Sequence, residues 1–62
     1  MKITIKDEPT NGSTTRGIWW ATAGEKVLAL EPYHDPKSKI ESLLEVIEKA
    51  KNAIQLQIET NL

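Results

Sequence analysis

Apolar and polar residues alternate at the beginning of the chain as they do in a half-buried β-strand. Residues 2–6 read Lys-Ile-Thr-Ile-Lys, so Ile3 and Ile5 share one face and the polar side chains share the other. A polar stretch that contains an Asn-Gly turn pair follows over residues 7–15. The pattern predicts one strand and then a loop.

Two further strands are predicted after this loop. Residues 16–22 form the first of them, and residues 26–31 form the second after a tight reversal in which Gly24 supplies a positive φ at low steric cost. The later segment is apolar on both faces, which indicates a strand that is covered on both sides or meets a partner. Its apolar residues are Val27, Leu28, Ala29 and Leu30.

Two adjacent tryptophans, Trp19 and Trp20, lie in the middle of the second strand. Successive strand residues point to opposite faces, so one indole is expected in the core and the other on the far side of the sheet. Burial of one tryptophan side chain removes about 150–250 Å² of surface from water, which stabilises a protein by about 4–6 kcal/mol. We therefore expect another subunit, a ligand or a partner to cover the second tryptophan.

A helix is predicted to begin at Pro36. Asp35 is a good N-cap and proline suits the first helical position, while Ser38 and Glu41 form a second candidate capping box one turn later. Apolar residues then recur at spacings of three and four and predict one stripe that faces the sheet. They are Ile40, Leu43, Leu44, Ile47 and Ala50.

The tail is compatible with two structures. Residues 54–59 alternate like a strand, which places Ile54, Leu56 and Ile58 on one face. The alternative is a helix that continues to the end and leaves Leu56 off its apolar stripe. We expect the strand, and because almost no connector precedes it, we expect it to pair with a neighbouring copy, since exchange of an element is a low-cost route to a two-fold dimer.

The predicted architecture is thus α+β: a single domain over residues 1–62, with a three-stranded antiparallel sheet, one helix and a C-terminal strand exchanged in a homodimer. Sixty-two residues bury only about 60% of the surface that the unfolded chain exposes, and no cysteine is present to form a disulfide or a thiolate zinc site. Association is the remaining common means of stabilisation. The candidate contact residues, for the second subunit or for another protein, are Trp19, Trp20, Leu28, Leu30, Ile54, Leu56 and Ile58.

Charge and chemical motifs exclude most other classes. The net charge is −1, no apolar run approaches a membrane span, and the start of the chain lacks the apolar stretch of a signal peptide, so a soluble cytoplasmic protein is expected. Tyr33, His34 and Asp35 form the single cluster with catalytic residue types, but sequence neighbours seldom share catalytic geometry and Asp35 suits the helix cap. We expect no catalytic residues, no metal site and no cofactor.

Single-stranded nucleic-acid binding is the first alternative function. Trp19 on a sheet surface could stack a base beside the cations Lys6, Arg16 and Lys26. Packing of both tryptophans is the simpler interpretation. With Lys2, these make four cations scattered along a slightly acidic chain, and such charges are common on the surface of any soluble protein.

The chain also resembles a known family. A first strand ending in Lys6-Asp7, a tryptophan in the second strand, a glycine turn before Glu25, Tyr33 ahead of the helix and a Lys-Asn-Ala tripeptide at residues 51–53 are similar to the YegP-like family of small domains of unknown function. The resemblance implies three strands, a helix and a last strand, with two subunits sharing one sheet through exchanged C-terminal strands. It implies no established activity.

A second resemblance gives the other alternative function. The strand-rich start followed by a helix that ends in Ala-Lys-Asn-Ala-Ile, residues 50–54, is similar to HicB-like antitoxins. The segment from Glu31 to Pro36 does not reproduce the Pro-Asp-x-Pro-Gly-like signature of those proteins.

Overall fold

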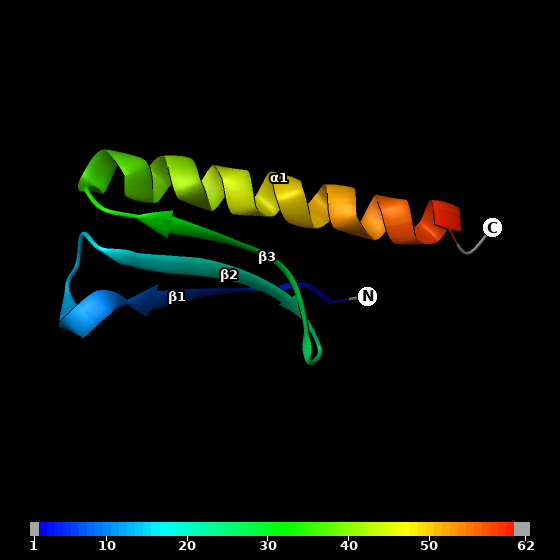
Figure 1. Ribbon diagram of the computed structural model, residues 1–62, viewed down its shortest axis with the longest axis horizontal. Helices are drawn as coiled ribbons and strands as arrows, with labels where there is room; N and C mark the ends of the chain where they lie inside the picture. The colour runs from blue at the N-terminus through cyan, green and yellow to red at the C-terminus, as the bar shows by residue number, and fades with distance from the viewer. Residues whose placement is uncertain (1, 61–62) are drawn as a thin grey trace.

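The structure is a computed structural model that describes the backbone of residues 2–60 and the side chains of residues 2–56. A three-stranded sheet forms one layer, and a single long helix packs along one face of it (Figure 1). The elements in chain order are β1 (Thr4–Pro9), the short 3-10 turn η1 (Thr10–Gly12), β2 (Gly17–Ala23), β3 (Lys26–Tyr33) and α1 (Pro36–Thr60).

The sheet is antiparallel with the order β1-β2-β3, which confirms the predicted three-stranded sheet and the α+β class. Ile5 pairs with Ala21 on one side of β2, and Ala21 pairs with Ala29 on the other. The β2–β3 register then shifts, so that Thr22 pairs with Val27 and Leu28 is the extra residue of a β-bulge. The bulge lets Leu28 and Ala29 both pack against the core.

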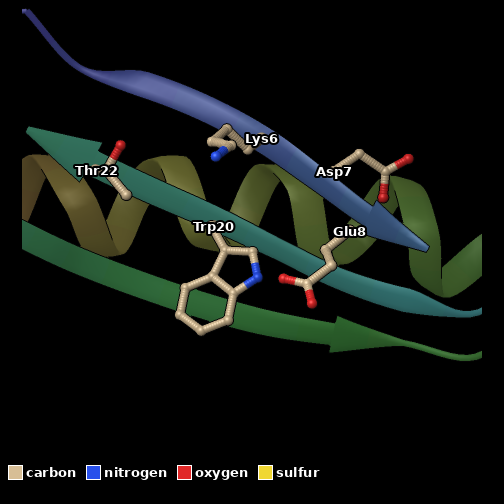
Figure 2. Close-up of a pocket in the computed structure, with 5 residues that line it drawn as sticks. All are labelled: Lys6, Asp7, Glu8, Trp20 and Thr22. Carbon is tan, nitrogen blue, oxygen red and sulfur yellow. The ribbon is translucent and has the colours of Figure 1, made fainter. Parts of the chain in front are cut away.

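The two tryptophans lie on opposite faces of β2, as the alternation predicts. Trp19 packs against the core beneath α1, and its indole N–H donates a hydrogen bond to the carbonyl of Lys39 at 2.9 Å. Trp20 is opposite Leu30 in the register and lies on the face turned away from α1 (Figure 2). We call this the open face of the sheet.

The predicted helix start is confirmed, with one change in its capping partner. The carboxylate of Asp35 accepts the backbone N–H of Ser38 at 2.6 Å, and the hydroxyl of Ser38 accepts the N–H of Asp35 at 3.0 Å. Pro36 occupies the first helical position. The reciprocal capping pair is therefore Asp35 with Ser38, in place of the expected pair of Ser38 with Glu41.

The core is small and is centred between β2 and the middle of α1. Ala21, Val46 and Ala50 are at most 1% exposed, and partly buried apolar side chains surround them. Val46 is absent from the predicted helical stripe, although it is the largest fully buried side chain of the described residues. The surrounding residues are Ile3, Ile5, Trp19, Leu28, Ala29 and Leu43.

The expected C-terminal strand is corrected by the structure. Residues 54–60 continue α1, so Ile54 and Leu56 are helical, and the alternative of a continued helix describes the tail. The physical reason is that no glycine or proline occurs between residues 37 and 60, so nothing in the sequence ends the helix. The strand that was expected to exchange between subunits is thus not found among the described residues. The side chain of Ile58 lies outside those described.

The last turns of α1 extend beyond the end of the sheet, toward the C-terminus marked in Figure 1. The central core cluster ends at Ala50, Ile54 is half-buried, and Leu56 is 65% exposed. Neither α1 nor any other described helical segment combines the length and apolar character needed to cross a membrane.

Candidate association surface

One flank of α1 carries large apolar side chains that the chain itself leaves uncovered. Ile40 is 65% exposed, Leu44 is 63% exposed and Ile47 is 39% exposed, and Ile54 continues the row one turn beyond Lys51. We call Ile40, Leu44, Ile47 and Ile54 the α1 seam. Exposure of several large aliphatic side chains on one helical flank marks a surface for association.

The seam lies on the side of α1 that is turned away from β3. The hydroxyl of Ser42 donates a hydrogen bond to the carbonyl of Pro32 at 2.8 Å, and the ammonium of Lys49 forms an ion pair with Glu31. These polar contacts fix one flank of α1 against β3. At 3.6 residues per turn, the seam falls on the opposite flank, about a quarter turn from the buried row of Val46 and Ala50.

The spacing of the seam is that of a helix that pairs with another helix. Leu44 follows Ile40 by four residues, and Ile47 follows Leu44 by three. Ile54 follows Ile47 by seven residues, and Lys51 divides this interval into steps of four and three. Alternate steps of four and three place side chains along one line of a helix, as in the a and d positions of a coiled coil. The seam therefore has both the exposure and the periodicity of a helix–helix contact.

The open face of the sheet is a second, more polar surface. Leu30 is 46% exposed and Val27 is 50% exposed beside the half-buried Trp20. An open hollow of about 410 Å³ adjoins Trp20, and it is lined by Lys6, Asp7, Glu8, Trp20 and Thr22 (Figure 2). The buried indole nitrogen of Trp20 has no hydrogen-bond partner among the described residues, and the nitrogen side of the ring faces Glu8.

A polar cluster at the start of α1 connects this helix to β1 and β3. The hydroxyl of Tyr33 donates to a carboxylate oxygen of Asp7 at 2.5 Å, and the ammonium of Lys39 lies 3.6 Å from the other oxygen of Asp7. The hydrogen bond to Asp7, together with burial, raises the pKa of Tyr33 to about 12. Tyr33 therefore keeps its proton, and the cluster stabilises the fold.

The cluster of catalytic residue types around His34 lies at the exposed start of α1. The imidazole of His34 is 76% exposed and lies 3.3 Å from the carboxylate of Asp35. That carboxylate caps α1, and its hydrogen bonds with Ser38 lower the pKa of Asp35. Within the described residues, no three His, Cys, Asp or Glu side chains gather where they could hold a metal ion.

The structure separates the predicted contact residues into three places. Trp19 and Leu28 pack against the protein's own core, whereas Trp20 and Leu30 lie on the open face. Ile54 and Leu56 lie on α1. The predicted set is therefore not one surface.

The residues proposed for nucleic acid do not gather either. Trp19 and Lys6 lie on opposite faces of the sheet, because Lys6 is the cross-strand neighbour of Trp20. Arg16 directly precedes β2, and Lys26 pairs with Ala23 at the other end of β2.

The sequence pattern did not predict the α1 seam, because two separate rows of apolar residues on the helix were interpreted as a single stripe. Leu43 and Ala50 belong to the row that faces the sheet, while Ile40, Leu44 and Ile47 belong to the exposed row. The adjacent pair Leu43-Leu44 was the available signal, since neighbours in a helix differ by about 100° and cannot both face one sheet.

The chain was compared with known proteins in three ways. It matches no protein-family model, no curated protein and no solved structure.

Proposed function

We propose that this protein is a non-catalytic assembly module that forms a homodimer through the α1 seam. The observation that carries the proposal is the exposure of Ile40, Leu44 and Ile47 at helix-pairing spacing on a single flank. The sequence argument for a second subunit started from surplus apolar surface. Ile40 and Leu44 are more exposed than the sheet residue Leu30, so the proposal uses the helix as the contact.

A second copy of the chain is the occupant that suits this surface. A two-fold axis makes the same patch meet itself, and a row of similar aliphatic side chains along a helix is complementary to an identical row. Among the described residues, only four apolar side chains are buried, and two of them are alanines, so the gain from covering the seam is large relative to that core. Full burial of one isoleucine or leucine contributes about 1.5–3 kcal/mol.

Molar mass in solution tests the proposal. Light scattering during size-exclusion chromatography should give twice the chain mass of 7.0 kDa for the wild-type protein. Leu44→Asp should give a folded monomer, because Leu44 is 63% exposed in the isolated chain and contributes little to its core. Asn52→Asp is the matched control, since it adds the same charge at an exposed position of α1 outside the seam, and it should stay dimeric.

Two outcomes would contradict the proposal in different ways. A wild-type protein that remains monomeric at the highest soluble concentration would overturn the homodimer. A Leu44→Asp variant that remains dimeric would retain the homodimer and remove the α1 seam as its contact. Far-ultraviolet circular dichroism of each variant shows that the helix is still formed.

A further inference from the structure

We infer that the two α1 helices of the dimer run antiparallel, and that Lys51 and Glu48 set this orientation. The inference rests on the proposed homodimer and names the arrangement of its two copies. Between Ile40 and Ile54, Lys51 is the one charged residue in line with the α1 seam. Its side chain is 68% exposed, and its ammonium lies 4.0 Å from the carboxylate of Glu48 in the same helix.

A parallel pair would bring the two Lys51 side chains together. In parallel helices with this spacing, each seam position meets the same position of the partner. Lys51 would then meet the partner's Lys51 between two apolar layers, where like charges repel and lose hydration. A lysine in such a position lowers the stability of the parallel arrangement and selects against it.

An antiparallel pair removes this conflict. The seam is nearly symmetric about residue 49, so reversing one helix places Leu44 opposite the partner's Ile54 and Ile47 opposite the partner's Lys51. The aliphatic stem of Lys51 then covers the partner's isoleucine while its ammonium remains at the edge of the contact. The partner's Glu48 is at the same level and supplies the opposite charge.

The length of α1 favours the same orientation. Its C-terminal turns extend beyond the sheet in Figure 1, and the half-buried Ile54 lies past the last residue of the central core cluster. In an antiparallel pair, this extension lies along the N-terminal half of the partner's helix, where the partner's Leu44 is exposed. In a parallel pair, the two extensions would meet each other, away from both sheets.

Disulfide cross-linking tests the orientation directly, because the chain contains no cysteine of its own. Leu44→Cys protein with an affinity tag is mixed with untagged Ile54→Cys protein, and the mixture is oxidised mildly. An antiparallel pair should give the tagged–untagged dimer alone, because identical positions lie about 15 Å apart along the axis at 1.5 Å per residue. A parallel pair should give cross-linked homodimers of each variant, and this result would overturn the inference.

Charge exchange tests the same point without cysteines. Lys51→Glu should weaken the wild-type dimer about three- to tenfold in its dissociation constant, and adding Glu48→Lys should restore it. A parallel pair would exchange one like-charge contact for another, so Lys51→Glu would leave its dissociation constant unchanged. An unchanged dissociation constant in Lys51→Glu, or an intact dimer that forms no tagged–untagged cross-link, overturns the antiparallel pair, whereas a monomeric wild-type protein overturns the homodimer itself.

Discussion

The indole N–H of Trp19 and the carbonyl of Lys39 form a hydrogen bond of 2.9 Å that joins the middle strand to the start of α1. The side chain of the same lysine lies 3.6 Å from Asp7 on β1 and 5.4 Å from the ring centroid of Tyr33 at the end of β3. Lys39 thus contacts all three strands. This explains how one helix is oriented on the sheet although the central core is small.

Replacement of the two tryptophans should separate their roles. Trp19→Phe should lower the free energy of unfolding by about 1–2 kcal/mol, because it removes the hydrogen bond to Lys39 and part of a packed ring. Trp20→Phe should cost less, because the buried indole N–H of Trp20 has no partner among the described residues. Urea denaturation followed by circular dichroism measures both, and an equal or larger loss for Trp20→Phe would contradict these assignments.

Alkaline pH should destabilise the protein through Tyr33. Its pKa is raised from 10.0 to about 12, first by the hydrogen bond to Asp7. A group whose folded-state pKa is raised contributes stability that is complete below its unfolded-state pKa, so this contribution is present below pH 10 and is lost as the pH rises toward 12. Tyr33 is the only tyrosine of the chain, so its tyrosinate absorbance reports this titration directly.

The Asp7→Asn variant is the control for the alkaline titration. Asparagine retains an acceptor oxygen but removes the negative charge, so the pKa of Tyr33 should fall toward 10. Lys49 has a raised pKa from its contact with Glu31 and loses stability in the same direction, so a smaller pH dependence should persist. An unchanged titration in Asp7→Asn would show that Asp7 does not hold the proton of Tyr33.

Gly17 should be intolerant of any side chain. A Cβ atom at this position would lie 2.5 Å from the carbonyl oxygen of Glu8, 2.6 Å from the hydroxyl of Tyr33 and 2.8 Å from the Cα of Pro9. Two of these neighbours are backbone atoms that cannot move without disturbing the β1–β2 pairing. Gly17→Ala should therefore cost about 2–3 kcal/mol of unfolding free energy.

Gly24→Ala is the matched substitution for Gly17→Ala. A Cβ atom at Gly24 would meet nothing within 4 Å, but the positive φ of 63° strains a residue other than glycine. Its cost should be about 1 kcal/mol. Thermal denaturation of both variants should thus show the larger loss at Gly17, and the reverse order would remove close packing as the reason for the glycine there.

The local elements could be read from the sequence because each depends on near neighbours. The alternation around Ile5 and Trp20, the turn at Gly24 and the cap at Asp35 each gave the correct element. The predicted ends of two strands differ from the structure: β1 continues to Pro9 and β3 continues to Tyr33, because pairing with β2 extends both strands through residues that favour loops.

The tail and the association surface could not be read in the same way. Ile54 and Leu56 satisfy a strand pattern as well as they satisfy the edges of a helix, and only the absence of a helix-ending residue decides between the two. The seam required knowledge of which helical row faces the sheet. Val46 settles this, because its complete burial fixes the rotation of α1 and leaves Leu44 outside.

Loss of the helix cap should destabilise the protein in a way that depends on acid pH. Hydrogen bonds from Ser38 lower the pKa of Asp35 below its ordinary value of 3.8. A group whose folded-state pKa is lowered contributes stability that is present above its unfolded-state pKa, so this contribution is lost as the pH falls below about 3.8. At neutral pH, Asp35→Ala should lower Tm by about 5 °C.

The Asp35→Asn variant distinguishes the hydrogen bond from the charge. Asparagine is as good an N-cap as aspartate, so it should retain most of the stability at neutral pH, because its amide oxygen can accept the N–H of Ser38. It cannot titrate, so Tm of Asp35→Asn should fall less between pH 5 and pH 3 than Tm of the wild-type protein. Equal acid sensitivity in the two proteins would assign the acid-labile contribution to other carboxylates, of which the ion-paired Glu31 on β3 is the first to replace.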